Sequence, residues 1–191
     1  SLMQARTAAF GPIRVGVIGA GKFSSMFLTQ ANKAANIHVV GVADINVPKA
    51  KAALARTGWA PERYSAATLD EAVRTGGTAV IDSADTLITH PAVEVILEIT
   101  GNPLYGTYHA VTAIDNGKHV IMVNVEADCM VGPLLQRRAQ AAGVVYSMAY
   151  GDQPALICEL VDWCRTVGFD VVAAGKGTKY LPEYNYSTPD T

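Results

Sequence analysis

The stretch IRVGVIGAGKFS, residues 13–24, decides the fold that this chain can adopt. An apolar run breaks into two closely spaced glycines, which predicts a strand, a tight turn and the start of a helix. Gly19 suits the tight turn, and Gly21 lets the backbone approach a phosphate group without a Cβ in the way. The helix that begins near Lys22 and Phe23 would aim free N–H groups and its positive dipole end at that phosphate. We therefore expect a phosphate-binding turn at this point of the chain.

An acidic residue downstream fits the same pattern. Residues 37–43 form a second apolar run, which ends at Asp44, 25 residues after Gly19 and 20 residues after the small Ser24. This spacing is typical of the carboxylate that accepts hydrogen bonds from the adenosine ribose in a Rossmann unit. Taken alone, Asp44 is better explained as a helix N-cap or a solvated loop residue. Together with the glycine turn, and with Ser24 as the third small position, it predicts a dinucleotide site.

The residues around Asp44 favour NAD over NADP as the cofactor. A carboxylate repels a 2′-phosphate, and the neighbouring Ile45 and Asn46 supply no guanidinium group to receive one. Lys49 and Lys51 lie close by in the sequence and are the argument for NADP.

Strand and helix patterns alternate along the rest of the chain. This alternation predicts an α/β fold, a doubly wound parallel sheet of the Rossmann type with helices on both faces. We expect a leader at residues 1–11 and an NAD(P)-binding Rossmann domain at residues 12–151. At residues 152–191 we expect a final helix and strand that lead into a catalytic and dimerisation domain largely absent from this chain. The expected elements include a helix at 132–142 and a last strand at 170–174.

Composition and charge exclude several kinds of partner. Half of the 191 residues are hydrophobic, and 15 basic and 17 acidic residues are scattered to give a net charge of −2. This balance indicates neither a nucleic-acid surface nor a membrane surface. No apolar run approaches the ~20 residues that span a bilayer, and no secretory pattern is visible, so we expect a cytoplasmic protein that binds a small molecule. The cysteines and histidines lack paired metal-ligand spacing, so no metal site is expected.

Polar residues after the later strands are candidates for the site, because ligands of an open parallel sheet bind outside the carboxyl ends of its strands. Thr100, Gly101 and Asn102 follow one apolar strand, and Asn124 follows the next. We expect these four residues to contact the cofactor. Glu126 comes two residues later, where it either faces the nicotinamide or substrate or is a helix-start acid that the dipole favours.

Three charged residues near the C-terminal end are the other catalytic candidates. Asp152 lies in the segment GDQP and is either a helix N-cap or a catalytic acid. Lys176 and Lys179 lie in the segment GKGTK, whose glycines suggest backbone close to a ligand. Two ammonium groups there suit an anionic substrate such as a carboxylate or phosphate.

Several of these segments together resemble a known family. The glycine turn, NVEAD at 124–128, GDQP at 151–154, AGKGTK at 174–179 and TPD at 188–190 are similar to the homoserine-dehydrogenase-like oxidoreductases that carry a C-terminal SAF domain. That group includes the deoxyxylulose-phosphate reductoisomerase-like enzymes. The resemblance implies a Rossmann domain, a catalytic domain that dimerises, and a SAF domain. It therefore implies a homo-oligomer formed through the part that this chain lacks.

The chain departs from that family at two places. Homoserine dehydrogenases follow the corresponding strand with Asn-Lys, and the lysine takes part in proton transfer, whereas here Asn124 is followed by Val125. Either Lys176 or Lys179 does the work of that lysine, or the reaction differs. The reductoisomerase-like branch has basic residues after the acid of the second strand, and residues 45–46 depart from that pattern.

The sequence as a whole predicts an NAD(P)-dependent oxidoreductase that moves hydride between nicotinamide and a small polar, anionic hydroxy or keto substrate. Two other functions fit parts of the sequence. One is an NAD-sensing regulatory domain that binds the cofactor without turnover, and the other is a methyltransferase that uses an S-adenosyl cofactor. The longer turn spacing through Lys-Phe-Ser at 22–24 argues against the methyltransferase.

Overall fold

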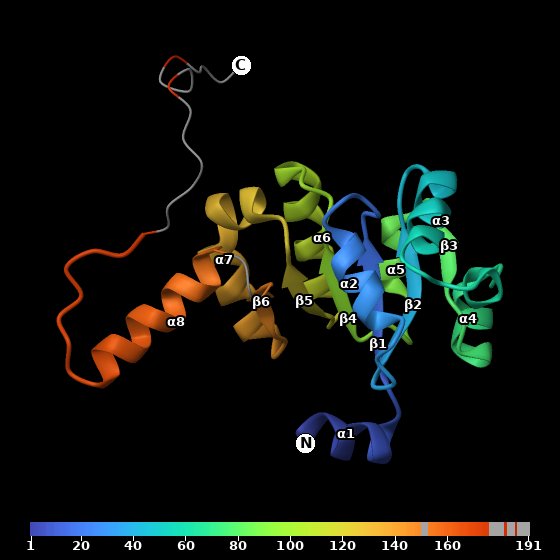
Figure 1. The fold of residues 1–191 in the computed structure, drawn as a ribbon, viewed down its shortest axis with the longest axis horizontal. Coiled ribbons are helices and arrows are strands. Elements are labelled where there is room, and N and C mark those ends of the chain that lie inside the picture. Colours follow the sequence, from blue (N-terminus) through green and yellow to red (C-terminus); the bar gives the residue numbers. More distant parts are fainter. Residues whose placement is uncertain (150–152, 176–181, 183–185, 187–191) are drawn as a thin grey trace. The chain divides into compact units, whose positions relative to one another are not determined.

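The computed structural model describes residues 1–149, 153–175, 182 and 186, and for residues 153–155 the backbone alone. The chain divides into two compact units, Ser1–Ala149 and Tyr150–Thr191. The first unit holds all six strands of the sheet (Figure 1). In the second unit the described residues form one helix, α8 (Gln153–Thr166). No helix in the described part of the chain combines the length and the apolar character needed to cross a membrane.

Six strands form one sheet in the order β3-β2-β1-β4-β5-β6, and every neighbouring pair is parallel. The strands are β1 (Ile13–Ile18), β2 (Ile37–Ala43), β3 (Ala79–Ile81), β4 (Val95–Glu98), β5 (His119–Met122) and β6 (Tyr146–Met148). The strand order reverses beside β1, and open parallel sheets bind their ligands at this switch point. The predicted α/β, doubly wound parallel sheet is confirmed.

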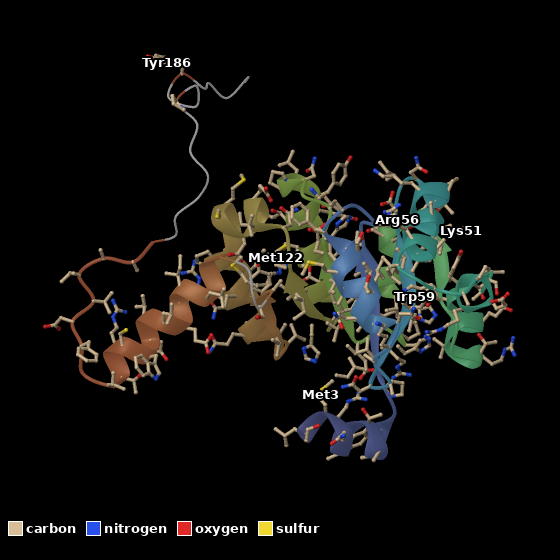
Figure 2. The ribbon with its side chains drawn as sticks, in the orientation of Figure 1. Met3, Lys51, Arg56, Trp59, Met122 and Tyr186 are labelled. Atoms are coloured by element: carbon tan, nitrogen blue, oxygen red, sulfur yellow. The ribbon has the colours of Figure 1, made fainter. Side chains whose placement is uncertain are left out.

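Helices cover both faces of the sheet, which is why the central strands are apolar on both sides. One face packs against four helices, α4 (Leu69–Thr75), α5 (Ala84–Thr89), α6 (Pro103–Asp115) and α7 (Val125–Ala142). The other face packs against α2 (Ser24–Ala31) and α3 (Val47–Arg56). Trp59, labelled in Figure 2, belongs to this second layer, and its indole N–H donates to the carbonyl of Leu28 at 2.9 Å.

A nine-residue helix, α1 (Leu2–Phe10), lies within the expected leader. Arg6 of this helix pairs with Glu94, whose carboxylate also accepts the backbone N–H of Arg14 at 2.9 Å. Burial tends to raise the pKa of Glu94, but the hydrogen bonds from Arg14 and the charges of Arg6 and Arg14 outweigh it and hold this pKa below its ordinary value. The ion pair therefore ties α1 to the start of the sheet.

The helix predicted at residues 132–142 begins earlier than expected. Its first residue is Val125, and Asn124 caps it, because the side-chain oxygen of Asn124 accepts the N–H of Ala127 at 3.1 Å. The helix continues through Pro133. The segment 124–128 is therefore a helix start and not a loop.

The strand predicted at residues 170–174 is wrong. This segment is irregular, and Val172 is 96% exposed. A strand is stable only where a neighbouring strand satisfies its backbone N–H and C=O groups. Within the described ranges, no strand pairs with this segment.

Candidate functional site

The glycine turn after β1 has a backbone conformation that only glycine adopts readily. Gly19 has a φ of 98°, and its N–H donates to the carbonyl of Ala43 at 2.8 Å. A Cβ on Gly19 would lie 3.0 Å from the carbonyl oxygen of Ile99 and 3.1 Å from the amide nitrogen of Thr100. A Cβ on Gly21 would meet no atom within 4 Å. The turn is therefore closed against the end of β4 at Gly19 and open to a ligand at Gly21.

Asp44 ties the end of β2 to the glycine turn. Its Oδ2 accepts the N–H of Ala20 at 2.8 Å, and its Oδ1 accepts the N–H of Asn46 at 2.8 Å. Each carboxylate oxygen has two lone pairs, so both oxygens can accept a further hydrogen bond from a ligand hydroxyl. Asp44 thus combines a fixed position with spare acceptor capacity.

No side chain caps the start of α2. The N-cap residue, Phe23, makes no side-chain capping bond and is 79% exposed. Lys22 is exposed in the preceding turn. Ser24 is fully buried, and its hydroxyl donates to the carbonyl of Gly21 at 2.8 Å. Ser24 therefore fixes the shape of the turn, as a small residue at a packed position.

A cavity of about 950 Å³ opens at the carboxyl ends of the strands. The glycine turn, the end of β2 with Asp44 and the N-terminal ends of α5 and α6 line it. Its lining residues are Ile18, Gly19, Gly21, Ala43, Asp44, Ile45, Asn46, Lys49, Asp82, Ser83, Ala84, Asp85, Ile99, Thr100, Asn102, Tyr105, Tyr108 and His109. The cavity therefore extends from the glycine turn to a wall of aromatic rings.

That wall comes from the first two turns of α6. Tyr105 stacks on His109, with ring centroids 6.2 Å apart, and Tyr108 meets His109 edge-on at 5.9 Å. The hydroxyl of Tyr108 donates to Asp85 of α5 at 3.2 Å. The three rings share one helix face because positions i, i+3 and i+4 are neighbours on an α-helix.

A buried glutamate lies behind the aromatic wall. Glu98 ends β4 and has no exposed surface. Its Oε1 accepts the hydroxyl of Thr100 at 2.5 Å and the amide N–H of Thr100 at 3.3 Å, and lies 3.2 Å from Nδ1 of His109. Across the residues that the structure describes, Oε2 of Glu98 is the one fully buried side-chain polar atom without a partner.

Asn124 joins the loop after β5 to the loop after β4. It is buried, and its side-chain amide donates to the carbonyl of Asn102 at 2.9 Å. Asn102 in turn caps α6, because its side-chain oxygen accepts the N–H groups of Leu104 and Tyr105, each at 3.1 Å. This chain of hydrogen bonds fixes the start of the aromatic wall.

The structure brings together half of the predicted cofactor-binding residues. Those that line the cavity are Gly19, Gly21, Asp44, Thr100 and Asn102. Those that do not line it are Lys22, Phe23, Ser24, Gly101 and Asn124. Of this second group, Ser24 and Asn124 support the turn and the loops, as described above.

The predicted catalytic residues are not gathered at the cavity. Glu126 lies in the first turn of α7 with an exposed side chain, and it does not line the cavity. Asp152, Lys176 and Lys179 lie outside the described residues. Their catalytic roles stay predictions.

Sequence reasoning missed the far side of the cavity. Tyr108, His109, Asp85 and the buried Glu98 are not among the site residues that the sequence predicts. Two signals could have found them. Rings at helical spacing follow the strand directly, and an acid interrupts an otherwise apolar strand next to them.

Two models of known families match the chain. One, described as "Oxidoreductase family, NAD-binding Rossmann fold", matches residues 13–122. The other, "Oxidoreductase DRL, catalytic domain", matches residues 151–191. Curated protein sequences give no match.

Solved structures of oxidoreductases have similar folds. A homoserine dehydrogenase from Thiobacillus denitrificans is 25% identical, with a TM-score of 0.57 over 72% of this chain and 29% of that one. The WlbA dehydrogenase from Bordetella pertussis, in complex with NADH and UDP-GlcNAcA, is 19% identical, with a TM-score of 0.57 over 82% of this chain and 40% of that one. Biliverdin reductase from Synechocystis, in complex with biliverdin and NADP⁺, is 22% identical, with a TM-score of 0.52 over 81% of this chain and 42% of that one. The chain therefore spans less than half the length of each of these three proteins.

Proposed function

The chain belongs to the oxidoreductase family with an NAD-binding Rossmann fold, and from this membership we propose that it binds NAD and transfers hydride to or from a small polar, anionic hydroxy or keto substrate. The bound cofactor would supply the hydride chemistry at its nicotinamide ring. The protein would supply the site that holds the adenosine half and the phosphates. The residues of that site are those that line the cavity.

One observation carries the proposal. The carboxylate of Asp44 is fixed at the cavity edge by the N–H of Ala20, inside the glycine turn. A ribose on Asp44 would therefore place the attached pyrophosphate beside Gly21, where the backbone is open. The uncapped start of α2 would add N–H groups and a positive dipole end to that phosphate site.

The same geometry favours NAD over NADP. A 2′-phosphate would meet the carboxylate of Asp44, and Ile45, which is 97% exposed beside it, offers no hydrogen-bond donor from its side chain. Lys49 also lines the cavity, and its ammonium group could attract such a phosphate. One structure of related fold contains NADH and another contains NADP⁺, so fold similarity alone does not favour either cofactor.

The substrate side of the proposal rests on the C-terminal residues. Asp152, Lys176 and Lys179 fall within residues 151–191, which match the catalytic-domain model. Two ammonium groups in a glycine-rich segment would attract an anionic substrate, and a carboxylate or ammonium group there could transfer the proton that accompanies hydride transfer. Glu126 stays a weaker candidate, because its exposed position at the start of α7 suits a helix-start acid.

Titration calorimetry with NADH and NADPH tests the cofactor assignment. We expect the protein to bind NADH more tightly than NADPH. Asp44→Ala should weaken NADH binding about 10- to 100-fold, because it removes hydrogen bonds to a charged acceptor worth about 1.5–3 kcal/mol. Glu62→Ala, which removes an exposed carboxylate outside the cavity, is the matched control and should bind NADH as the unmodified protein does. If the unmodified protein binds neither dinucleotide, the proposal fails.

Turnover needs a separate assay. NADH absorbance should fall when the protein is mixed with one of a panel of small keto acids or phosphorylated ketones. Replacing Lys176 and Lys179 by Met should then raise KM for the anionic substrate more than for a neutral analogue. Binding of NADH without turnover on any member of the panel would count against the oxidoreductase proposal and leave the cofactor site standing.

A further inference from the structure

Two aspartates follow the neighbouring strands β2 and β3 at the cavity. Ala43 is paired with Ile81 in the sheet, and the N–H of Asp44 donates to the carbonyl of Ile81 at 3.0 Å. Asp82 is the next residue after Ile81, so Asp44 and Asp82 leave adjacent parallel strands at the same edge of the sheet. Both residues line the cavity.

Asp82 has more spare acceptor capacity than the other polar side chains that follow β3. The hydroxyl oxygen of Ser83 caps α5 by accepting the N–H of Thr86 at 3.1 Å. The carboxylate of Asp85 accepts the hydroxyl of Tyr108 at 3.2 Å. Among the residues that the structure describes, none forms a hydrogen bond or an ion pair with Asp82, which is exposed. Both oxygens of its carboxylate are therefore available to a ligand that donates hydrogen bonds.

The position of the ribose decides which part of the cavity the base can reach. In the proposed function the ribose lies on Asp44, after β2, and the pyrophosphate lies beside Gly21, after β1. The base and the 5′-phosphate leave a ribose from opposite sides of its ring oxygen, so a phosphate on the β1 side directs the base away from β1. In the order β3-β2-β1-β4, the strand beyond β2 is β3. The base therefore extends toward Asp82.

The side chain that lies between these two aspartates in the cavity lining is apolar. Ile45 directly follows Asp44, lines the cavity and is exposed. Nucleotide sites commonly combine apolar side chains, which cover a flat ring, with a few polar groups that fix its orientation. Ile45 can cover one face of a base here, and Asp82 can bind a donor at the edge of that base.

We propose that Asp82 selects the base of the dinucleotide: its carboxylate accepts a hydrogen bond from the exocyclic amine of adenine, while Ile45 packs against one face of the ring. The inference rests on the proposed function, since it assumes a dinucleotide whose ribose lies on Asp44. A carboxylate only accepts hydrogen bonds, so it favours a base that carries a donor at this position. Asp82 is a specificity-determining residue in this scheme.

The test compares NADH with reduced nicotinamide purine dinucleotide, in which a hydrogen atom replaces the exocyclic amine and nothing else changes. Each compound is titrated calorimetrically into the protein. We expect NADH to bind about tenfold more tightly, which is the lower end for a hydrogen bond to a charged acceptor, because Asp82 keeps contact with solvent. Equal affinities would overturn the inference and leave the proposed function intact. Binding of neither compound would count against both.

Variants of Asp82 show whether this residue causes the preference. In Asp82→Ala the ratio of the two affinities should fall from about ten to about one, and the affinity for the purine compound should not change. Asp82→Asn keeps one acceptor oxygen without the charge, so it should retain a ratio of about three. A general disturbance of the loop would weaken both compounds equally and leave the ratio at ten, which would overturn the inference.

Asp85→Ala is the matched control, because it removes the other carboxylate that follows β3 and lines the cavity. Its ratio should stay near ten. A ratio that falls in Asp85→Ala and persists in Asp82→Ala would overturn the assignment to Asp82. The comparison of the two compounds on the unmodified protein tests the inference even if a variant does not fold.

Discussion

Replacing Gly19 by alanine should destabilise the fold, and the structure sets the size of the effect. A φ of 98° costs a residue with a Cβ about 1–2 kcal/mol. The new Cβ would lie 3.0 Å from the carbonyl carbon and oxygen of Ile99. These backbone atoms directly follow the central strand β4, so they cannot move away without disturbing the sheet. Such overpacking adds about 1–3 kcal/mol. We therefore expect Gly19→Ala to lower the free energy of unfolding by about 2–5 kcal/mol.

Urea titration followed by circular dichroism measures this loss, and Gly21→Ala is the matched control. A Cβ on Gly21 meets no atom within 4 Å, and its φ is not positive, so Gly21→Ala should change the free energy of unfolding by less than about 0.5 kcal/mol. It should nevertheless weaken NADH binding, because the Cβ would occupy the open side of the turn. The reasoning is refuted if Gly19→Ala is as stable as the unmodified protein, or if both alanine variants lose the same stability.

Three further predictions concern stability. Glu94→Gln should reduce the loss of stability that the protein shows as pH falls from about 5 toward 3. Arg14 and Arg6 hold the folded-state pKa of Glu94 below its ordinary value of 4.5, so the ionised carboxylate stabilises the fold and this contribution is lost when the carboxylate is protonated. Urea titrations at several pH values would measure the difference. Lys118→Met should cost about 1–3 kcal/mol in the same titrations, because its ammonium group donates to two backbone carbonyls at 2.8 and 2.9 Å, whereas the exposed Lys51→Met (Figure 2) should cost almost nothing. Trp59→Phe should lower the thermal midpoint by several degrees through the loss of a buried indole hydrogen bond, and an unchanged midpoint would contradict that role.

The parts of the fold that the sequence predicted are those set by local pattern. Parallel strands buried on both faces give continuous apolar runs, so the strand at residues 37–43 could be placed to the residue. The glycine turn and Asp44 form a unit of about 25 residues, and its spacing is fixed by one strand-helix-strand crossover. The same logic failed at α7, because Gly132 and Pro133 suggest a helix start, whereas the capping bond of Asn124 begins the helix seven residues before Gly132.

The aromatic end of the cavity could not be predicted in the same way. Glu98 and His109 meet only because β4 turns Glu98 toward the face that α6 covers, and because the helix places His109 toward the sheet. The hydrogen bond from Tyr108 to Asp85 joins α6 to α5 through residues that are 23 positions apart in the sequence. Such contacts depend on the rotation of each helix over the sheet, and neither periodicity nor composition specifies that rotation. The strand expected at 170–174 failed for a related reason, since a strand requires a partner elsewhere in the chain.

The order of strands in the sheet has a consequence for folding. β1 pairs with β2, where Ile13 is matched with Ile37, and on its other side with β4, where Val15 is matched with Val95. The second pairing joins residues 80 positions apart, so at 5–20 residues per second a ribosome needs roughly 4 to 16 s to make the missing neighbour. During that interval the centre of the sheet has one unpaired apolar edge. The centre of the sheet, with the glycine turn at its end, therefore cannot be completed before β4 has been synthesised. Before that time, the exposed apolar edge of β1 makes the newly made chain most accessible to chaperones.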